Sequence, residues 1–148
     1  MKRMFLIAAL LATQVQAASW KKIYQEPFDS EYPLALNVYE VDTSSVAVRN
    51  GLVQAWLRHT RLPGQQVEGS YPAKYYKSSI SLSHFDCVYK ETATSRQLLY
   101  DDSFGSGEVV ETSSLSKDLL TKSMTPVAPG TVGEGILTAV CAMRGKKK

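Results

Sequence analysis

Alternation of apolar and polar residues recurs along most of the chain and predicts β-strands. The stretch 35–42, ALNVYEVD, alternates in this way and is rich in residues that favour strands. The same pattern occurs at 74–90, at 95–102 and, after a glycine-rich turn, at 107–114. We therefore expect the α+β class, with an antiparallel β-sheet of about five to six strands in a meander-like order.

The clearest local signal is a hairpin around Asn50-Gly51. This dipeptide is preferred in a type I′ turn, because both central residues need positive φ. The turn predicts three cross-strand pairs: Arg49 with Leu52, Val48 with Val53, and Val46 with Ala55. One face then carries Val46, Val48, Val53, Ala55 and Leu57. Trp56 lies on the other face, with Leu52, Gln54 and Arg58, and belongs either to the core or to a covered interface.

A loop is expected after this hairpin. Residues 62–73, LPGQQVEGSYPA, contain two prolines and two glycines, which break the strand pattern. The following strand signal starts at Lys74.

The period of the pattern changes at 126–143, which predicts a short helix. Thr131 and Glu134 form a capping box, in which the threonine hydroxyl accepts from the Glu134 amide and the glutamate reaches back to the Thr131 amide. Apolar residues follow on one side of the helix: Ile136, Leu137, Val140 and Cys141. Gly133 and Gly135 each cost about 1 kcal/mol of helix propensity. We therefore expect the helix to pack on one face of the sheet.

Residues 1–17 have the layout of a secretory signal peptide. A positive start, MKR, precedes an apolar run of about ten residues and a small-residue ending at Ala17. The run is too short to span a bilayer, and no cysteine follows it for lipid attachment. We expect an exported mature chain from Ala18, periplasmic, secreted or at the cell surface, with neither a lipid anchor nor a transmembrane segment.

The formal net charge of +3 does not describe the expected domain, 18–143. Of the 17 basic residues, two lie in the signal peptide and four in the tail 144–148, which leaves 11 against 14 acidic residues. No basic face is available for nucleic acid. The basic tail is either a solvated end or a weak tether to acidic surfaces.

His84, Asp86 and Cys87 have the residue types of a cysteine nucleophile with its base, or of a metal site. Alternate residues of a strand point to opposite faces, so Cys87 lies on one face and the other two on the opposite face. The other histidine, His59, belongs to a different strand. We therefore reject catalysis and metal binding here, and we find no other catalytic, phosphate-binding or cofactor motif.

Cys87 and Cys141 are the two cysteines of a chain that we expect to be exported. Cys87 lies on an aromatic-lined strand face, and Cys141 lies on the apolar side of a helix that must pack on a sheet. We predict a disulfide between them, which links the helix to the sheet.

The segment Tyr71–Lys77 is the expected contact site for a protein partner. Tyrosines offer rigid contact area with a polar tip and are enriched in interfaces. The candidate residues are Tyr71, Lys74, Tyr75, Tyr76 and Lys77, with Trp56 as a second location. The alternative is that one or two of these tyrosines are core residues, and strand alternation turns either Tyr75 or Tyr76 inward.

Several short motifs occur in order along the mature chain. They are Trp20 and Ile23; Tyr39, Val41, Asp42, Ser45 and Val46; Tyr76, Ser78, Ser79, Phe85, Asp86 and Cys87; Arg96 and Tyr100; and Pro129, Gly130, Thr131, Glu134 and Cys141. This series resembles the surface-adhesin protein E-like domain family of bacterial envelope proteins. The resemblance implies an antiparallel sheet with a packed C-terminal helix and a non-enzymatic role. The family's named member is a lipid-anchored adhesin for host proteins such as vitronectin and laminin.

The leading hypothesis is therefore an exported, adhesin-like binding module for a host matrix or serum protein. The alternative is a small periplasmic or secreted inhibitor of a hydrolase such as lysozyme, since compact disulfide-linked β-domains also perform that role. The sequence leaves open the identity of the ligand and whether the domain forms a homodimer.

Overall fold

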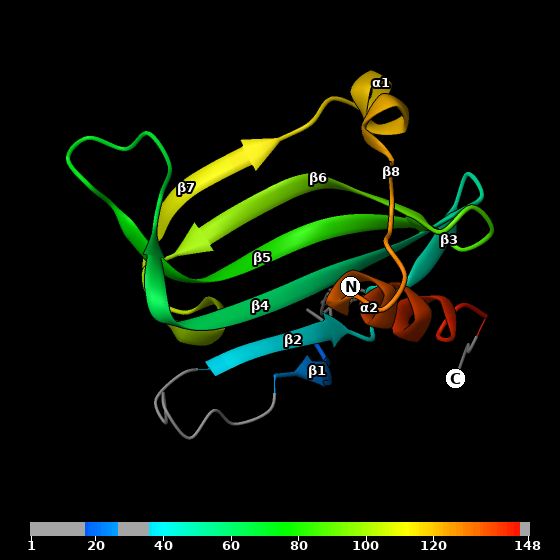
Figure 1. Cartoon of the computed structure of the whole chain (residues 1–148), viewed down its shortest axis with the longest axis horizontal. Helices are drawn as coiled ribbons and strands as arrows, with labels where there is room; N and C mark the ends of the chain where they lie inside the picture. Colours follow the sequence, from blue (N-terminus) through cyan, green and yellow to red (C-terminus); the bar gives the residue numbers. More distant parts are fainter. Residues whose placement is uncertain (1–16, 27–35, 146–148) are drawn as a thin grey trace, which may run out of the picture.

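An antiparallel sheet with a C-terminal helix on one face makes up the fold (Figure 1). The computed structural model describes residues 17–26 and 36–145, so most of the expected signal peptide and the last three lysines lie outside it. The strands are β1 (Trp20–Gln25), β2 (Leu36–Asp42), β3 (Ala47–Arg49), β4 (Leu52–Gln66), β5 (Tyr75–Asp86), β6 (Glu91–Tyr100), β7 (Val109–Ser114) and β8 (Thr125–Pro126).

The longer strands follow the order β1-β2-β4-β5-β6-β7, which is the expected meander. The sheet has eight strands rather than five to six, because β1 and the two-residue β8 were not among the strands that the alternation predicted. β3 pairs with the start of β4, which β2 does not reach, and β8 pairs with the start of β6, which β7 does not reach. A strand of two residues such as β8 is too short to carry an alternation that a sequence pattern could reveal, whereas β3 was expected as the first strand of the hairpin at Asn50-Gly51.

The loop that we expected at 62–73 is shorter than predicted, because β4 continues to Gln66. Pro63 and Gly64 lie in the register shift between Thr60 and Gln65, where β4 has no ladder partner on β5. The missing N–H of Pro63 therefore costs no ladder hydrogen bond to β5, and a strand can pass through it. Only 67–74 connects β4 to β5.

The hairpin at Asn50-Gly51 is confirmed, with φ values of 51° and 81°. Two predicted pairs, Arg49 with Leu52 and Val48 with Val53, are present, but β3 begins at Ala47 and its ladder ends with the pair Ala47–Gln54. Val48 is 59% exposed rather than part of the core. Its strand is paired on one side only, at the margin of the sheet.

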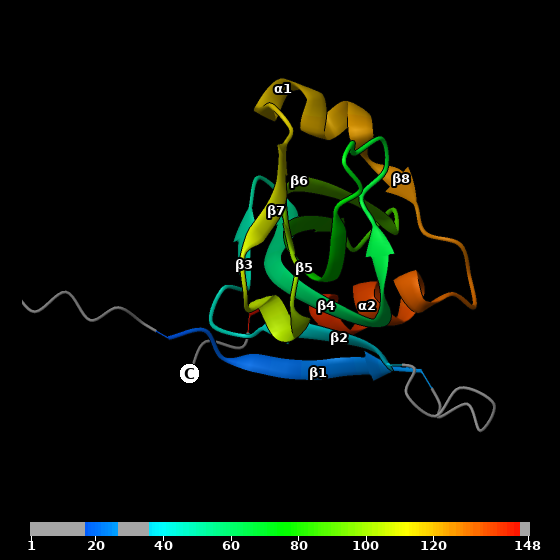
Figure 2. The ribbon, with the colours of Figure 1, turned by 90° about the vertical axis from the view of Figure 1, so that its left-hand side faces the viewer.

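The core forms where α2 (Val132–Cys141) lies on the sheet. Ile136, Leu137 and Val140 are buried, as the apolar stripe predicted. They pack against Val41, Val53, Ala55, Leu57 and Phe85 from three strands. We call this side of the sheet the helix face. Figure 2 shows that the sheet is curled, with α2 on the inner side of the curl.

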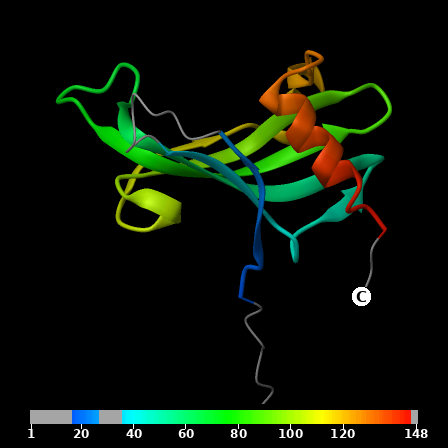
Figure 3. The same ribbon diagram turned by 60° about the horizontal axis from the view of Figure 1, so that its bottom comes forward.

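The opposite face carries the short 3₁₀ helix η1 (Ser103–Gly105), as Figure 3 shows. η1 is held by hydrogen bonds from the Phe104 amide to Thr60 Oγ1 (3.1 Å) and from the Gly105 amide to Ser78 Oγ (2.8 Å). Two further turns, α1 (Lys117–Leu120) and η2 (Thr121–Ser123), connect β7 to β8.

Thr131 caps α2 as predicted, because its hydroxyl accepts from the Glu134 amide at 3.3 Å. The second half of the capping box is different. The Glu134 carboxylate accepts from the Gly130 amide at 2.8 Å instead of the Thr131 amide. Gly130 has a φ of 72°, and this left-handed turn presents its own N–H to the carboxylate.

Thr131→Ala should lower the free energy of unfolding by about 0.5–2 kcal/mol, because the Glu134 amide loses its acceptor. Thr131→Ser keeps the hydroxyl and is the matched control. Urea denaturation of the three proteins measures the difference. Equal stability of the alanine and serine variants would contradict the assigned cap.

The predicted disulfide is present: Cys87 and Cys141 are bonded, with an S–S distance of 1.97 Å. Cys87 lies in the turn directly after β5 rather than in a strand, and Cys141 is the last residue of α2. The bond therefore joins the C-terminal end of the helix to the end of β5.

The double substitution Cys87→Ser/Cys141→Ser should lower the free energy of unfolding by about 2–5 kcal/mol, since the loop of sequence separation 54 is no longer closed. Reduction of the unmodified protein should have the same effect. Thiol alkylation without reductant should label nothing in the oxidised protein, and complete labelling would show that the bond is not formed.

Candidate protein-binding site

The loop 67–74 is held by a buried residue at its start and by hydrogen bonds within the loop. Val67 is only 3% exposed, and its amide donates to the Lys74 carbonyl at 2.8 Å. The Ser70 hydroxyl donates to the Val67 carbonyl (2.8 Å) and accepts from the Lys74 amide (3.0 Å). These bonds restrict the loop before any partner binds, which reduces the entropy lost on binding.

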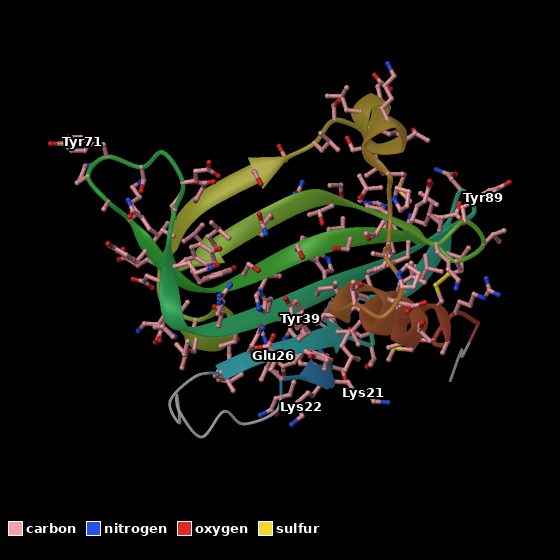
Figure 4. The ribbon with its side chains drawn as sticks, viewed as in Figure 1. Lys21, Lys22, Glu26, Tyr39, Tyr71 and Tyr89 are labelled. Atoms are coloured by element: carbon pink, nitrogen blue, oxygen red, sulfur yellow. A yellow bond between two sulfur atoms is a disulfide. The ribbon has the colours of Figure 1, made fainter. Side chains whose placement is uncertain are left out.

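Three of the predicted contact residues lie together on this loop and at its junction with β5. Tyr71 is fully exposed, and Figure 4 shows it at the loop tip, pointing away from the sheet. Tyr75 is 58% exposed, and Lys74 is exposed beside it. The structure thus presents two tyrosines and one lysine to solvent.

Tyr76 and Lys77 are placed differently. Tyr76 is half-buried, and its hydroxyl donates to Gln65 Oε1 at 2.9 Å. Gln65 of β4 and Tyr76 of β5 are directly opposite each other in the sheet. Of the two adjacent tyrosines, Tyr76 is therefore the one that turns inward. Lys77 is exposed, with its Nζ 3.6 Å from Asp102 Oδ1, so an acidic neighbour partly balances its charge.

Trp56 does not join this group. It is half-buried between Ala55 and Leu57, which are core residues of the helix face, so its side chain lies on the opposite face. Trp56 pairs with Leu82, six positions along β5 from Tyr76, which corresponds to a separation of about 20 Å. The two predicted locations are separate surfaces.

One row of residues crosses the helix face beyond the end of α2. Directly opposite residues of antiparallel strands share a face, and the register places these five in line: Tyr39, His59, Ser79, Leu99 and Glu111. The row connects an aromatic cluster near β1 to a hollow near the loop. Neither feature was found from the sequence, because the cluster depends on the alignment of three strands and the hollow on the alignment of four.

The hollow lies at the β7 end of the row and has a volume of about 550 Å³. Its lining combines apolar, amide and carboxylate groups from the loop and from four strands: Gln65, Gln66, Val67, Glu68, Tyr76, Leu99 and Glu111. We call it the loop hollow. The charged residues in this lining, Glu68 and Glu111, are both acidic. The sequence, in contrast, led us to expect a positively charged contact site.

The aromatic cluster at the other end of the row is closely stacked. The rings of Tyr39 and His59 lie 4.0 Å apart and nearly parallel, and Tyr24 is tilted against Tyr39 at 6.1 Å. His59 Nε2 donates to Asn37 Oδ1 at 2.6 Å. Figure 4 shows Tyr39 over β2, with Glu26 near it.

Burial shifts the titration of this cluster. Desolvation, with a smaller effect of Arg61, lowers the pKa of His59, and Glu26 acts in the opposite direction. Desolvation also raises the pKa of Tyr39, with a further contribution from Glu26. Both rings are therefore held in their neutral forms near neutral pH.

His84 and Asp86 make hydrogen bonds within the fold. His84 is 3% exposed, with Nε2 2.7 Å from Ser95 Oγ and Nδ1 3.2 Å from the Gln54 amide nitrogen, and desolvation lowers its pKa. Asp86 Oδ1 accepts from the amides of Val88 and Tyr89, both at 2.9 Å, and holds the turn after β5. With Cys87 in a disulfide, this cluster offers no thiol.

Across 17–26 and 36–145, no group of three or more His, Cys, Asp or Glu side chains is placed to hold a metal ion. In the same part of the chain, no helix has the length and apolar character needed to cross a membrane.

Fold and site together define an α+β domain that presents exposed tyrosines on a disulfide-linked sheet. The chain belongs to the surface-adhesin protein E family, whose model matches residues 15–142. This match confirms the resemblance seen in the short motifs. A comparison with curated proteins finds no match.

Solved structures of Haemophilus influenzae protein E are similar to this chain. Its crystal form II has 21% identity and a TM-score of 0.52, covering 73% of this chain and 83% of that one. The selenomethionine form has 20% identity and a TM-score of 0.49, covering 70% and 78% of the two chains. At this level of identity, the likeness to crystal form II supports the fold alone.

The free energy of unfolding should fall as the pH is lowered through about 6.5, the ordinary pKa of histidine. Both histidines have lowered pKa values in the folded protein, so the unfolded chain binds more protons in this range. The loss should continue until the pH falls below the folded pKa values. Urea denaturation between pH 7.5 and pH 5 measures it.

The matched test is the double variant His59→Gln/His84→Gln, which should show a smaller dependence on pH in this window whatever its absolute stability. An unchanged slope would show that these histidines do not produce the effect.

Proposed function

We propose that this protein is an exported, non-enzymatic binding module that attaches to host extracellular-matrix or serum proteins of the vitronectin and laminin class. The observation that carries the proposal is the family match over residues 15–142, since the family is that of the surface-adhesin protein E. Export is supported by the signal-peptide pattern at 1–17.

The loop 67–74 and the start of β5 are the contact site that we propose. Tyr71 and Tyr75 offer exposed aromatic area, and Lys74 adds a positive charge between them. Aromatic residues on a rigid support contribute strongly to interfaces. The internal hydrogen bonds of the loop supply this support. The Trp56 face is the second location.

The double variant Tyr71→Ala/Tyr75→Ala should weaken binding to immobilised vitronectin or laminin by about tenfold or more, since two exposed aromatic contacts are lost. Biolayer interferometry measures the affinity. Tyr89→Ala is the matched control, because Tyr89 is 76% exposed and lies at the other end of the sheet (Figure 4). All variants should keep the melting temperature within a few degrees.

Lys74→Glu should weaken binding and reduce its salt dependence if the ligand surface is acidic at this point. Lys122→Glu makes the same charge change on exposed η2 and serves as its control. Unchanged affinity in both loop variants would move the site to the Trp56 face.

One further assay distinguishes the adhesin proposal from the alternative, a hydrolase inhibitor. A protein that binds neither matrix protein but blocks a muramidase at a 1:1 ratio would replace the adhesin proposal with the inhibitor.

A further inference from the structure

We propose that the loop hollow and the free edge of β7 together bind an extended basic segment of a protein ligand, with a lysine or arginine side chain between Glu68 and Glu111. This inference rests on the proposed function and names the chemistry of the partner that the site takes.

The charge of the hollow is the first observation. Glu68 comes from the loop and Glu111 from β7, and both are exposed. The ion pairs within the described residues involve other carboxylates, those of Glu40, Asp102 and Glu134. Two carboxylates without a basic partner in this part of the chain favour a cation and repel an acidic ligand.

The lining below the carboxylates suits the stem of a basic side chain. Leu99 and Val67 are 8% and 3% exposed, and Tyr76 contributes a half-buried ring held by its bond to Gln65. Lysine and arginine place an aliphatic stem on apolar surface and keep the charged head at a polar rim. An aromatic ring beside the head adds a cation–π contact. A hollow of about 550 Å³ is large enough for more than one side chain, which favours a peptide over a single ion.

The edge of the sheet indicates how such a segment would lie. β7 ends the strand order and pairs with β6 alone among the described strands. Its sequence, VVETSS, contains neither lysine nor proline, which protect edge strands against pairing. The other edge, β1, carries exposed Lys21 and Lys22. Of the two ends of the strand order, the β7 edge is therefore the one that is open to strand addition.

Strand addition and the hollow are geometrically compatible. A strand added to β7 places every second side chain on the helix face, next to Glu111. Backbone hydrogen bonds then supply sequence-independent affinity, and the hollow selects a basic side chain.

The test uses the mature protein and a short, terminally blocked peptide in which lysine alternates with threonine, followed by fluorescence anisotropy at low salt. Glu68→Gln/Glu111→Gln should weaken peptide binding by about tenfold, from two exposed charge contacts. Glu108→Gln is the matched control, because Glu108 is exposed beside β7 but does not line the hollow. Equal affinities of the double variant and the control would overturn the proposal.

Two further probes separate the parts of the site. N-methylation of alternate peptide amides, made in both registers, should abolish binding in at least one register, and tolerance of both would overturn strand addition. Spermidine supplies the same charge without a peptide backbone and should bind much more weakly. If spermidine binds as tightly as the peptide, the hollow is a polyamine site and the proposal is wrong.

The same variants distinguish this inference from the proposed function. If Glu68→Gln/Glu111→Gln loses the peptide but keeps full affinity for vitronectin or laminin, the inference about the ligand fails and the adhesin function stands. If neither matrix protein binds while the peptide does, the adhesin function fails and the peptide site stands.

Discussion

The rest of the structure depends on the packing of α2 against one end of the curled sheet. Val140, Val41 and Ala55 have no exposed surface, and they lie where the helix meets β2 and β4. A helix that contains two glycines is marginal alone. Its position is stabilised by burial of its apolar side, by the cap at Thr131 and by the disulfide at its C-terminal end.

A ten-residue helix covers only part of the helix face, which explains the character of the remainder. Under α2 the helix face is aliphatic, whereas the row beyond α2 runs from Tyr39, His59 and Ser79 to Leu99 and Glu111 at the loop hollow. Polar side chains can line this part because none of the described helices covers it. The open end of the face, the loop 67–74 and β7 meet at the loop hollow, which is the region that we propose for partner binding.

The contact site at Tyr71–Lys77 stays a prediction, but the exposure of its residues can be compared with what the sequence led us to expect. The exposure of Tyr71 and the inward turn of one adjacent tyrosine follow from loop chemistry and strand alternation. The acidic rim could not be predicted, since Glu68 and Glu111 are far apart in the sequence. They meet because β4, β5, β6 and β7 are aligned in register.

Local features of the sequence determined the hairpin at Asn50-Gly51, the cap at Thr131, the apolar side of α2 and, with only two cysteines, the disulfide partners. Each of these depends on neighbouring residues or on elimination, so no long-range geometry is needed. Tertiary structure alone decided that β4 passes through Pro63, that β8 extends the sheet, and that Trp56 lies far from the loop. These features depend on strand register, because only pairing between distant segments determines which backbone groups need partners and which side chains meet.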